Sequence, residues 1–215
     1  MKSTQRAVVL LSGGIDSATS LYIAVKKYSV TAVTFVYNGI AKKELVSARA
    51  IANSVNVEEH RLVRLPDMRE AQDIQSSVFA NMPPTYIPMR NSIFYSFAGS
   101  IAEEKNASVI IGGHINGDEL LFKDATKSFF RQMQRLIWES SDLLRNNRTR
   151  ILTPLSRLRK YQVVKKAVYL GVPLHSTWSC HKDGREHCWE CDGCLSRIEA
   201  FSTAGIRDPL KNTKS

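Results

Sequence analysis

Residues 8–21 read VVLLSGGIDSATSL, and this stretch decides the fold. An apolar run ends abruptly in a Ser-Gly-Gly-x-Asp-Ser segment and helix-forming residues follow, which is typical of a buried strand that turns into a helix. Two adjacent glycines, Gly13 and Gly14, let the turn adopt unusual conformations and let a ligand approach the backbone. Backbone N–H groups of such a turn and of the following helix converge on one point. The stretch therefore predicts a phosphate-binding site.

The residue types narrow the phosphate chemistry. A loop for γ-phosphate transfer requires a lysine directly before its Ser or Thr, and residues 8–21 contain no lysine. The stretch instead resembles the PP-loop of the ATP pyrophosphatases, which release pyrophosphate and leave AMP on a substrate oxygen. A ligand-free turn rich in glycine and serine is the alternative. The resemblance implies that Asp16 helps to hold Mg²⁺ and that ATP is bound by Leu11, Ser12, Gly13, Gly14, Ile15, Asp16, Ser17, Ala18, Thr19, Ser20 and Leu21.

Length and composition bound the remaining possibilities. A chain of 215 residues can form one α/β domain with a small appendage. The segment before the first strand lacks the features of a signal peptide, and no apolar run is long enough to span a bilayer. We therefore expect a cytoplasmic protein without a membrane partner. The net charge of +10 favours polyanionic ligands, including nucleotides and RNA, although a basic solvated surface explains it equally well.

Strand and helix patterns alternate along the chain. The pattern of residues 17–27, 41–54 and 127–144 predicts helices, whereas that of residues 30–37 and 61–65 predicts strands. Such alternation predicts an α/β fold with a doubly wound, Rossmann-like parallel sheet and a ligand at the carboxyl ends of its strands. We expect a PP-loop domain over residues 1–175, a C-terminal segment packed on it over 176–206, and a disordered tail over 207–215.

Polar residues that follow later strands are candidates for substrate recognition. Residues 66–89 form a long polar connection, which we interpret as a wall of the substrate site. Arg90 and Asn91 stand at the mouth of the next helix, where a guanidinium can bind a carboxylate or phosphate; ordinary helix capping is the alternative. Asp118 and Asp124 follow a strand that ends in two glycines, so they can bind metal or the N–H donors of a purine-like ring.

All four cysteines lie within residues 180–194 with the spacing C-x7-C-x2-C-x2-C. In a cytosolic protein such clustering indicates metal rather than disulfides. Four thiolates close a tetrahedron around Zn²⁺ and leave no open position, so the predicted site is structural. An iron–sulfur cluster is the alternative. The predicted metal ligands are Cys180, Cys188, Cys191 and Cys194.

Several blocks, taken together, resemble the 7-cyano-7-deazaguanine synthases of the PP-loop group, which make the nitrile precursor of queuosine and archaeosine for tRNA modification. These blocks are LSGGIDSAT (11–19), YIPMRNSIF (86–94), TPL (153–155), LGVP (170–173) and TWSC (177–180). The resemblance implies an ATP- and Mg²⁺-dependent C–N ligase that joins ammonia to 7-carboxy-7-deazaguanine through an adenylated carboxylate and then an adenylated amide. It implies catalytic roles for Ser12, Asp16, Ser17 and Arg90, and substrate binding by Arg90, Asn91, Asp118 and Asp124. It also suggests a homodimer. Direct nucleic-acid binding is not expected, because the basic run 145–166 contains no aromatic residue apart from Tyr161.

Two segments depart from the family pattern. Residues 112–126 read GGHINGDELLFKDAT, without the family's Ser-Gly-Tyr-Pro portion or the arginine after Asp124, and residues 38–40 replace a Gly-Gln-x segment. Other interpretations therefore stay open beside the synthase. They are a divergent paralogue that transfers the deazapurine carboxylate to another amine, a PP-loop tRNA-modifying enzyme such as a thiolase, and a zinc module that binds RNA through residues 145–166.

Overall fold

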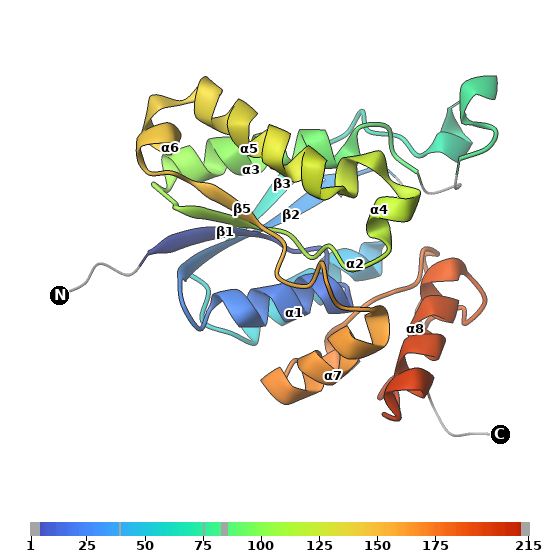
Figure 1. The fold of residues 1–215 in the computed structure, drawn as a ribbon. Helices are drawn as coiled ribbons and strands as arrows, with labels where there is room; N and C mark the ends of the chain where they lie inside the picture. The colour runs from blue at the N-terminus through green and yellow to red at the C-terminus, as the bar shows by residue number, and fades with distance from the viewer. Residues whose placement is uncertain (1–4, 39, 75, 83–85, 212–215) are drawn as a thin grey trace.

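The computed structural model describes residues 5–38, 40–74, 76–82 and 86–211. One sheet of five parallel strands, in the order β3-β2-β1-β4-β5, forms the centre of the molecule (Figure 1). Helices cover both faces of the sheet, so the predicted doubly wound α/β fold is confirmed. The strands are β1 (Arg6–Leu10), β2 (Ser29–Tyr37), β3 (Glu59–Leu65), β4 (Val109–Ile111) and β5 (Arg150–Leu152).

Two layers of helices sandwich the sheet (Figure 1). One layer holds α1 (Ile15–Ala24), α2 (Lys42–Asn53) and α7 (Lys160–Leu170), with α8 (Asp192–Ala204) packed on α7. The other holds α3 (Arg90–Glu104), α5 (Lys127–Ser140) and α6 (Asp142–Asn146). A short α4 (Asp118–Leu121) and the 3-10 turns Ala71–Asp73, Ser77–Phe79, Lys123–Ala125 and Leu174–Ser176 lie in the connections. Within the described chain, no helix has the length and apolar character needed to cross a membrane.

Successive residues of the central strand feed two separate hydrophobic cores. Ala7 and Val9 of β1 point into the core beneath α1 and α7, whereas Val8 points into the core beneath α3 and α5. This alternation follows from the period of two along a strand, and it explains why β1 is an unbroken apolar run. Since β1 lies between β2 and β4, the chain changes direction across the sheet beside it. Ligands of such sheets bind at this switch point.

Some boundaries differ from the sequence prediction. Helix α1 begins at Ile15, directly after Gly14, whereas a start at residue 17 was expected from the pattern. The helix expected over 127–144 is broken at Ser141, whose side chain accepts a hydrogen bond from Leu144 N and so begins α6. Helix α8 was not predicted at all.

The prediction of a disordered tail over residues 207–215 is wrong for the first of these residues. Asp208 is buried and forms an ion pair with Arg197 of α8, at 2.6 Å between Oδ2 and Nε. An ionised pair of this kind holds the chain against the domain as far as Asp208. Residues 212–215 of the expected tail lie outside the described residues.

Candidate active site

The loop between β1 and α1 is held in one conformation by its own serines. Ser17 Oγ accepts a hydrogen bond from Ser12 N and donates one to Gly14 O, both at 3.1 Å. Ser12 Oγ lies 3.0 Å from Ser17 Oγ and accepts from Gly14 N at 3.3 Å. These bonds fix the loop before any ligand arrives, so its backbone N–H groups are oriented in advance.

The two glycines of the loop are required for different reasons. Gly13 has φ +89°, and a methyl group on it would lie 2.6 Å from Glu44 O and 2.7 Å from Ala48 N of α2. Gly14 has φ −76°, and a methyl group there would lie no closer than 3.5 Å to protein. Gly13 therefore lets α2 pack against the loop, while Gly14 faces the cleft and leaves room for a ligand.

A cleft of about 280 Å³ opens beside this loop at the carboxyl edge of the sheet. It is bounded by the loop, the ends of β1 and β2, the starts of α2 and α3, and the segment that follows β4. Its lining residues are Leu10, Leu11, Ser12, Gly14, Asp16, Ser17, Val33, Phe35, Tyr37, Ile40, Glu44, Arg90, Asn91, Phe94, Gly112, Gly113 and His114. The topology thus brings segments distant in sequence to one polar site.

Asp16 lies in the first turn of α1 and is only half satisfied. Its Oδ2 accepts a hydrogen bond from Lys160 Nζ at 2.5 Å, whereas its Oδ1 is buried and finds no hydrogen-bond partner within the described chain. A free carboxylate oxygen beside a phosphate loop fits a hard divalent cation such as Mg²⁺. Lys160 was not predicted from sequence, because it is the first residue of α7 and lies far from the loop in the chain.

Arg90 and Asn91, the first residues of α3, line the cleft together with the loop. Asp124 holds them in place: its Oδ2 accepts from Asn91 N, and its backbone carbonyl accepts from Asn91 Nδ2, both at 3.0 Å. The Arg90 guanidinium lies 5.7 Å from the centre of the Phe122 ring. The structure therefore places Arg90 in the cleft and gives Asp124 the geometry of a helix cap.

The segment after β4 closes the cleft beside His114. Asp118 Oδ2 accepts a hydrogen bond from Ile115 N at 3.0 Å and lies 3.8 Å from His114 Nδ1. Burial, reinforced by the Arg90 charge, lowers the pKa of His114 to about 4, so this imidazole is neutral at pH 7. The described residues that line the cleft include neither Asp118 nor Asp124. These two carboxylates thus do not face the cleft; they hold in place the segments that form its wall.

Three features of the cleft were missed by the sequence analysis. Phe35 and Phe94 stack with ring centres 4.1 Å apart and planes 6° from parallel, which provides a flat apolar wall. Tyr37 lies at the end of β2, and burial raises its pKa to about 12, so its hydroxyl stays protonated. Glu44 of α2 also faces the cleft. Phe94 belongs to a block singled out in the sequence, but nothing local to Glu44 or Tyr37 distinguishes them from surface or core residues.

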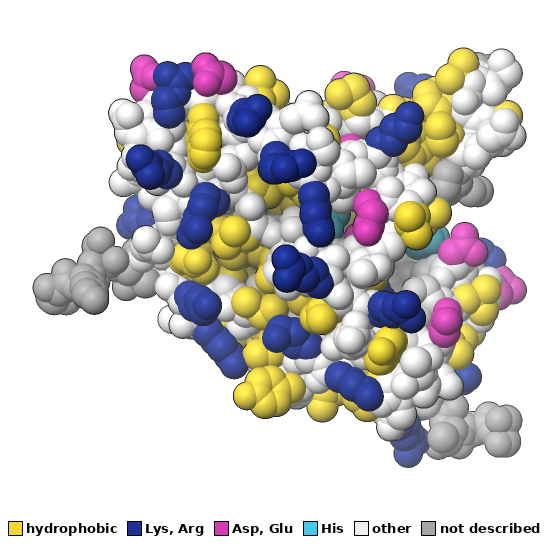
Figure 2. All heavy atoms as spheres, viewed as in Figure 1, with side chains coloured by type: hydrophobic (Ala, Val, Ile, Leu, Met, Phe, Trp, Pro, Cys, Tyr) yellow, Lys and Arg dark blue, Asp and Glu magenta, His cyan; other side chains and the backbone are white. Residues whose placement is uncertain are grey.

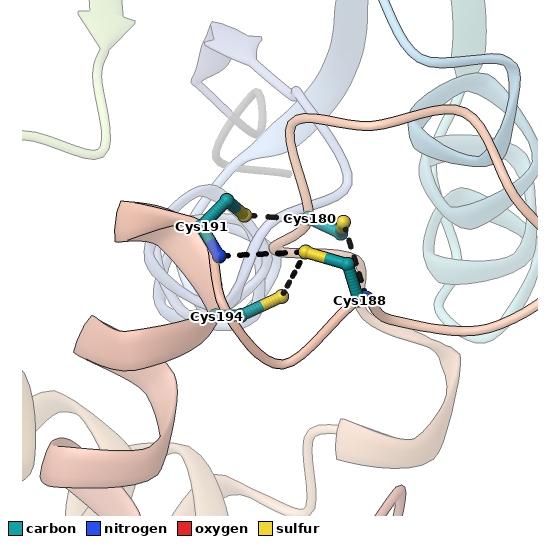
Figure 3. A group of neighbouring side chains, drawn as sticks. All are labelled: Cys180, Cys188, Cys191 and Cys194. Carbon is teal, nitrogen blue, oxygen red and sulfur yellow. Dashed lines mark hydrogen bonds between the residues drawn. The ribbon is translucent and has the colours of Figure 1, made fainter.

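The four predicted metal ligands come together at the start of α8 (Figure 3). Their Sγ atoms all lie within 4.8 Å of one another, with Cys180 to Cys191 and Cys188 to Cys194 at 3.9 Å. Zn–S bonds of about 2.3 Å in a tetrahedron require sulfur atoms roughly 3.8 Å apart. Backbone N–H groups of residues 182, 188 and 191 point at these sulfurs at 3.4–3.5 Å, as thiolates require. The cluster therefore fits a tetrahedral metal ion.

The cysteine segment contacts the phosphate loop directly. Trp178 N donates a hydrogen bond to Gly13 O at 3.0 Å, and Trp178 Nε1 donates to Cys180 O at 2.7 Å. Asp183 Oδ1 accepts from Lys42 N, at the start of α2, at 2.7 Å. A metal ion that orders the cysteines would thus also stabilise the phosphate loop and the start of α2.

Comparison with known proteins decides the family. The model of the family described as "Queuosine biosynthesis protein QueC" matches residues 6–205. The chain belongs to the QueC family. Curated relatives named 7-cyano-7-deazaguanine synthase include those of Aliarcobacter butzleri, 34% identical over 97% of this chain and 96% of that one, and of Thermoplasma volcanium, 35% identical over 98% and 92%. The family resemblance inferred from the sequence blocks is confirmed.

Solved structures with the same fold support the architecture of this QueC family member. The chain is similar to NMN synthetase from Francisella tularensis, with a TM-score of 0.57 and 18% identity over 96% of this chain and 79% of that one. It is also similar to the NH3-dependent NAD synthetase of Campylobacter jejuni, with a TM-score of 0.53 and 19% identity over 82% of this chain and 68% of that one. At this identity the likeness concerns the fold alone.

Proposed function

We infer that this QueC family member is a 7-cyano-7-deazaguanine synthase, an ATP-dependent C–N ligase. It adenylates the carboxylate of 7-carboxy-7-deazaguanine, lets ammonia displace AMP to give the amide, and adenylates the amide to give the nitrile. The observation that carries this inference is the cleft itself. Its lining combines a phosphate loop, an acidic residue with a free oxygen, a guanidinium and a flat aromatic wall.

On the nucleotide side, the residues of the loop act on the leaving pyrophosphate. Backbone N–H groups of the loop and the hydroxyls of Ser12 and Ser17 are preorganised as donors, so they stabilise the charge that develops when the α–β bond breaks. Lys160 adds a positive charge beside Asp16. When bound at Asp16, Mg²⁺ would neutralise charge on the phosphates. These roles are proposals supported by the fixed loop and by the free Asp16 Oδ1.

On the substrate side, Arg90 is placed to hold the carboxylate in line with the α-phosphate, because its guanidinium presents a planar fork to oxyanions. The stacked pair of Phe35 and Phe94 provides a face for a flat purine-like ring. Asn91, Asp118 and Asp124 are proposed to act by positioning other groups, since their hydrogen bonds fix α3 and the segment after β4.

Zn²⁺ is the metal we propose for the four cysteines, with a structural role. The alternatives with another acceptor or with RNA receive less support. The basic run 145–166 is divided between α6 on one side of the sheet and α7 on the other (Figure 1). Lys and Arg side chains are dispersed among apolar and neutral ones over the face shown in Figure 2. Small molecules, including ammonia, are therefore the proposed partners; a homodimer is proposed from the family resemblance alone.

Mass spectrometry after incubation with ATP, Mg²⁺, ammonium and 7-carboxy-7-deazaguanine tests the proposal. We expect the nitrile together with two AMP for each product molecule. Asp16→Ala should abolish AMP formation, and Lys160→Ala should slow it by about 10²-fold or more, as expected for lost transition-state stabilisation. AMP without nitrile would indicate another acceptor, and absence of AMP from the wild-type protein would refute the assignment.

A further inference from the structure

A smaller space of about 110 Å³, here called the side chamber, adjoins the cleft. Tyr37, Ile40, Glu44 and Arg90 line both spaces, so the side chamber opens directly toward the phosphate loop. Its outer wall consists of Ala41, Glu70, Cys180 and His181. The described residues around the chamber thus come from β2, the start of α2, the start of α3 and the cysteine segment, with Glu70 from the connection after β3.

The charges around the side chamber favour one small cation. Among the described residues that line it, Glu44 and Glu70 contribute two carboxylates, against the guanidinium of Arg90 and the imidazole of His181, which lowers the pKa of Glu70 when charged. Tyr37 keeps its hydroxyl proton, and its oxygen can accept a hydrogen bond. A volume of about 110 Å³ admits a small polyatomic ion but not a nucleotide or a purine-like ring.

Glu44 distinguishes the chamber from an ordinary acidic surface. Its side chain is partly buried and lines both spaces, yet its carboxylate forms neither a hydrogen bond nor an ion pair with any residue that the structure describes. Burial raises the pKa of Glu44 to about 7, an effect that Arg90 opposes and Glu70 reinforces. The Glu44 carboxylate therefore stands without a protein partner between the chamber and the reaction site, where it can accept a proton from a ligand.

We propose that the side chamber receives ammonium and that Glu44 takes its proton, so that neutral ammonia enters the cleft beside the adenylated carboxylate. This inference rests on the proposed function. The N–H bond of ammonium breaks and its proton goes to Glu44 Oε. The freed lone pair then forms the C–N bond to the acyl carbon, the C–O bond to AMP breaks with its electron pair, and the nitrogen gives its surplus proton to the phosphate of the departing AMP. No oxidant or further reactant is needed.

Glu44→Gln tests the proposal, because it keeps the size of the side chain and removes the base. With ammonium as the varied substrate, we expect kcat/KM to fall by about 10²-fold or more, as for loss of a general base. Exchange of labelled pyrophosphate into ATP, driven by 7-carboxy-7-deazaguanine, should stay within about twofold of wild type, since adenylation precedes amine attack. Hydroxylamine, which is largely uncharged at neutral pH, should restore product formation as the hydroxamate.

Matched variants separate the possible outcomes. Glu70→Gln should raise the KM for ammonium with little change in kcat, while Glu199→Gln on the exposed face of α8 should match wild type. Normal use of ammonium by Glu44→Gln, or equal loss of pyrophosphate exchange and ammonium use, would overturn the role of the chamber. If the wild-type protein shows no exchange, the proposed function fails before the chamber is tested. Should Glu44→Gln fail to fold, the KM effect of Glu70→Gln decides alone.

Discussion

At the scale of single residues, Gly13 and Gly14 make different demands on the backbone. Gly13→Ala places a methyl group against the backbone of α2 at a positive φ, so we expect a loss of about 2 kcal/mol or more in the free energy of unfolding. Gly14→Ala fits the conformation and the space that the protein leaves. Thermal denaturation should therefore show a large drop for Gly13→Ala and a small one for Gly14→Ala.

Ligand binding should show the opposite contrast. Because Gly14 lines the cleft, a methyl group there obstructs the approach of phosphate, and ATP affinity measured by calorimetry should fall although the fold persists. Equal melting temperatures for the two variants would contradict the packing of α2 against Gly13.

Ionisation of Glu44 should lower the free energy of unfolding as the pH rises. Its pKa is about 7 in the folded protein and near its ordinary value of 4.5 in the unfolded chain. The folded state therefore binds the proton more tightly, and stability is lost as pH rises through this window. Allowing for partial access of water, Glu44→Gln should be about 1–2 kcal/mol more stable than wild type at pH 8.

Denaturant unfolding at two pH values measures this effect. At pH 4.5 and below, Glu44 is protonated in the folded protein, and the advantage of Glu44→Gln should disappear. An advantage that is the same at both pH values would assign the gain to packing rather than to charge. The Glu199→Gln variant, exposed on α8, provides the control.

At the scale of elements, the predictable parts are those with a local signal. β1, the phosphate loop and the metal site could be predicted because their signals lie in short stretches of sequence: a hydrophobic run, a Gly-Gly turn and the spacing of the cysteines. Helix α8 was missed because its first turn overlaps the cysteine cluster and begins with Asp192-Gly193, a pair that is typical of turns. Glu44 reaches the cleft through the packing of α2, and Lys160 reaches Asp16 through the packing of α7; no local pattern encodes either contact.

The segment after α8 is anchored by a buried ion pair that the sequence did not reveal. The Arg197 side chain is 0% exposed and donates to Asp208, Thr177 and the carbonyl of Leu174. Asp208→Asn leaves a buried guanidinium without its counter-charge, and breaking such a pair costs about 3–5 kcal/mol. We expect a melting temperature lower by roughly 10 °C for a chain of this size.

A surface ion pair is the appropriate comparison. Asp142 lies 3.7 Å from Arg145 and its side chain is 91% exposed. Asp142→Asn should leave the melting temperature nearly unchanged, because water screens such pairs. Similar losses for both aspartate variants would show that Arg197 is not anchored by Asp208 as the structure has it.

At the scale of the whole molecule, the cysteine cluster and the phosphate loop form one connected unit. Trp178 bonds to Gly13 on one side and Cys180 on the other, and Cys180 with His181 closes the side chamber. A structural metal ion that orders the cysteines therefore also affects the conformation of the nucleotide site. Metal removal should therefore impair catalysis although no cysteine touches the phosphate loop.

Elemental analysis and metal removal test this connection. We expect one zinc per chain, without the visible absorption of an iron–sulfur cluster. Treatment with a chelator, followed by its removal and assay in excess Mg²⁺, should lower both the melting temperature and the rate of pyrophosphate exchange; added Zn²⁺ should restore both, since structural zinc supplies folding energy. Cys188→Ser should reproduce the loss and resist rescue. Unchanged exchange in the zinc-free protein would mean that Trp178 and Gly13 hold the loop without the metal.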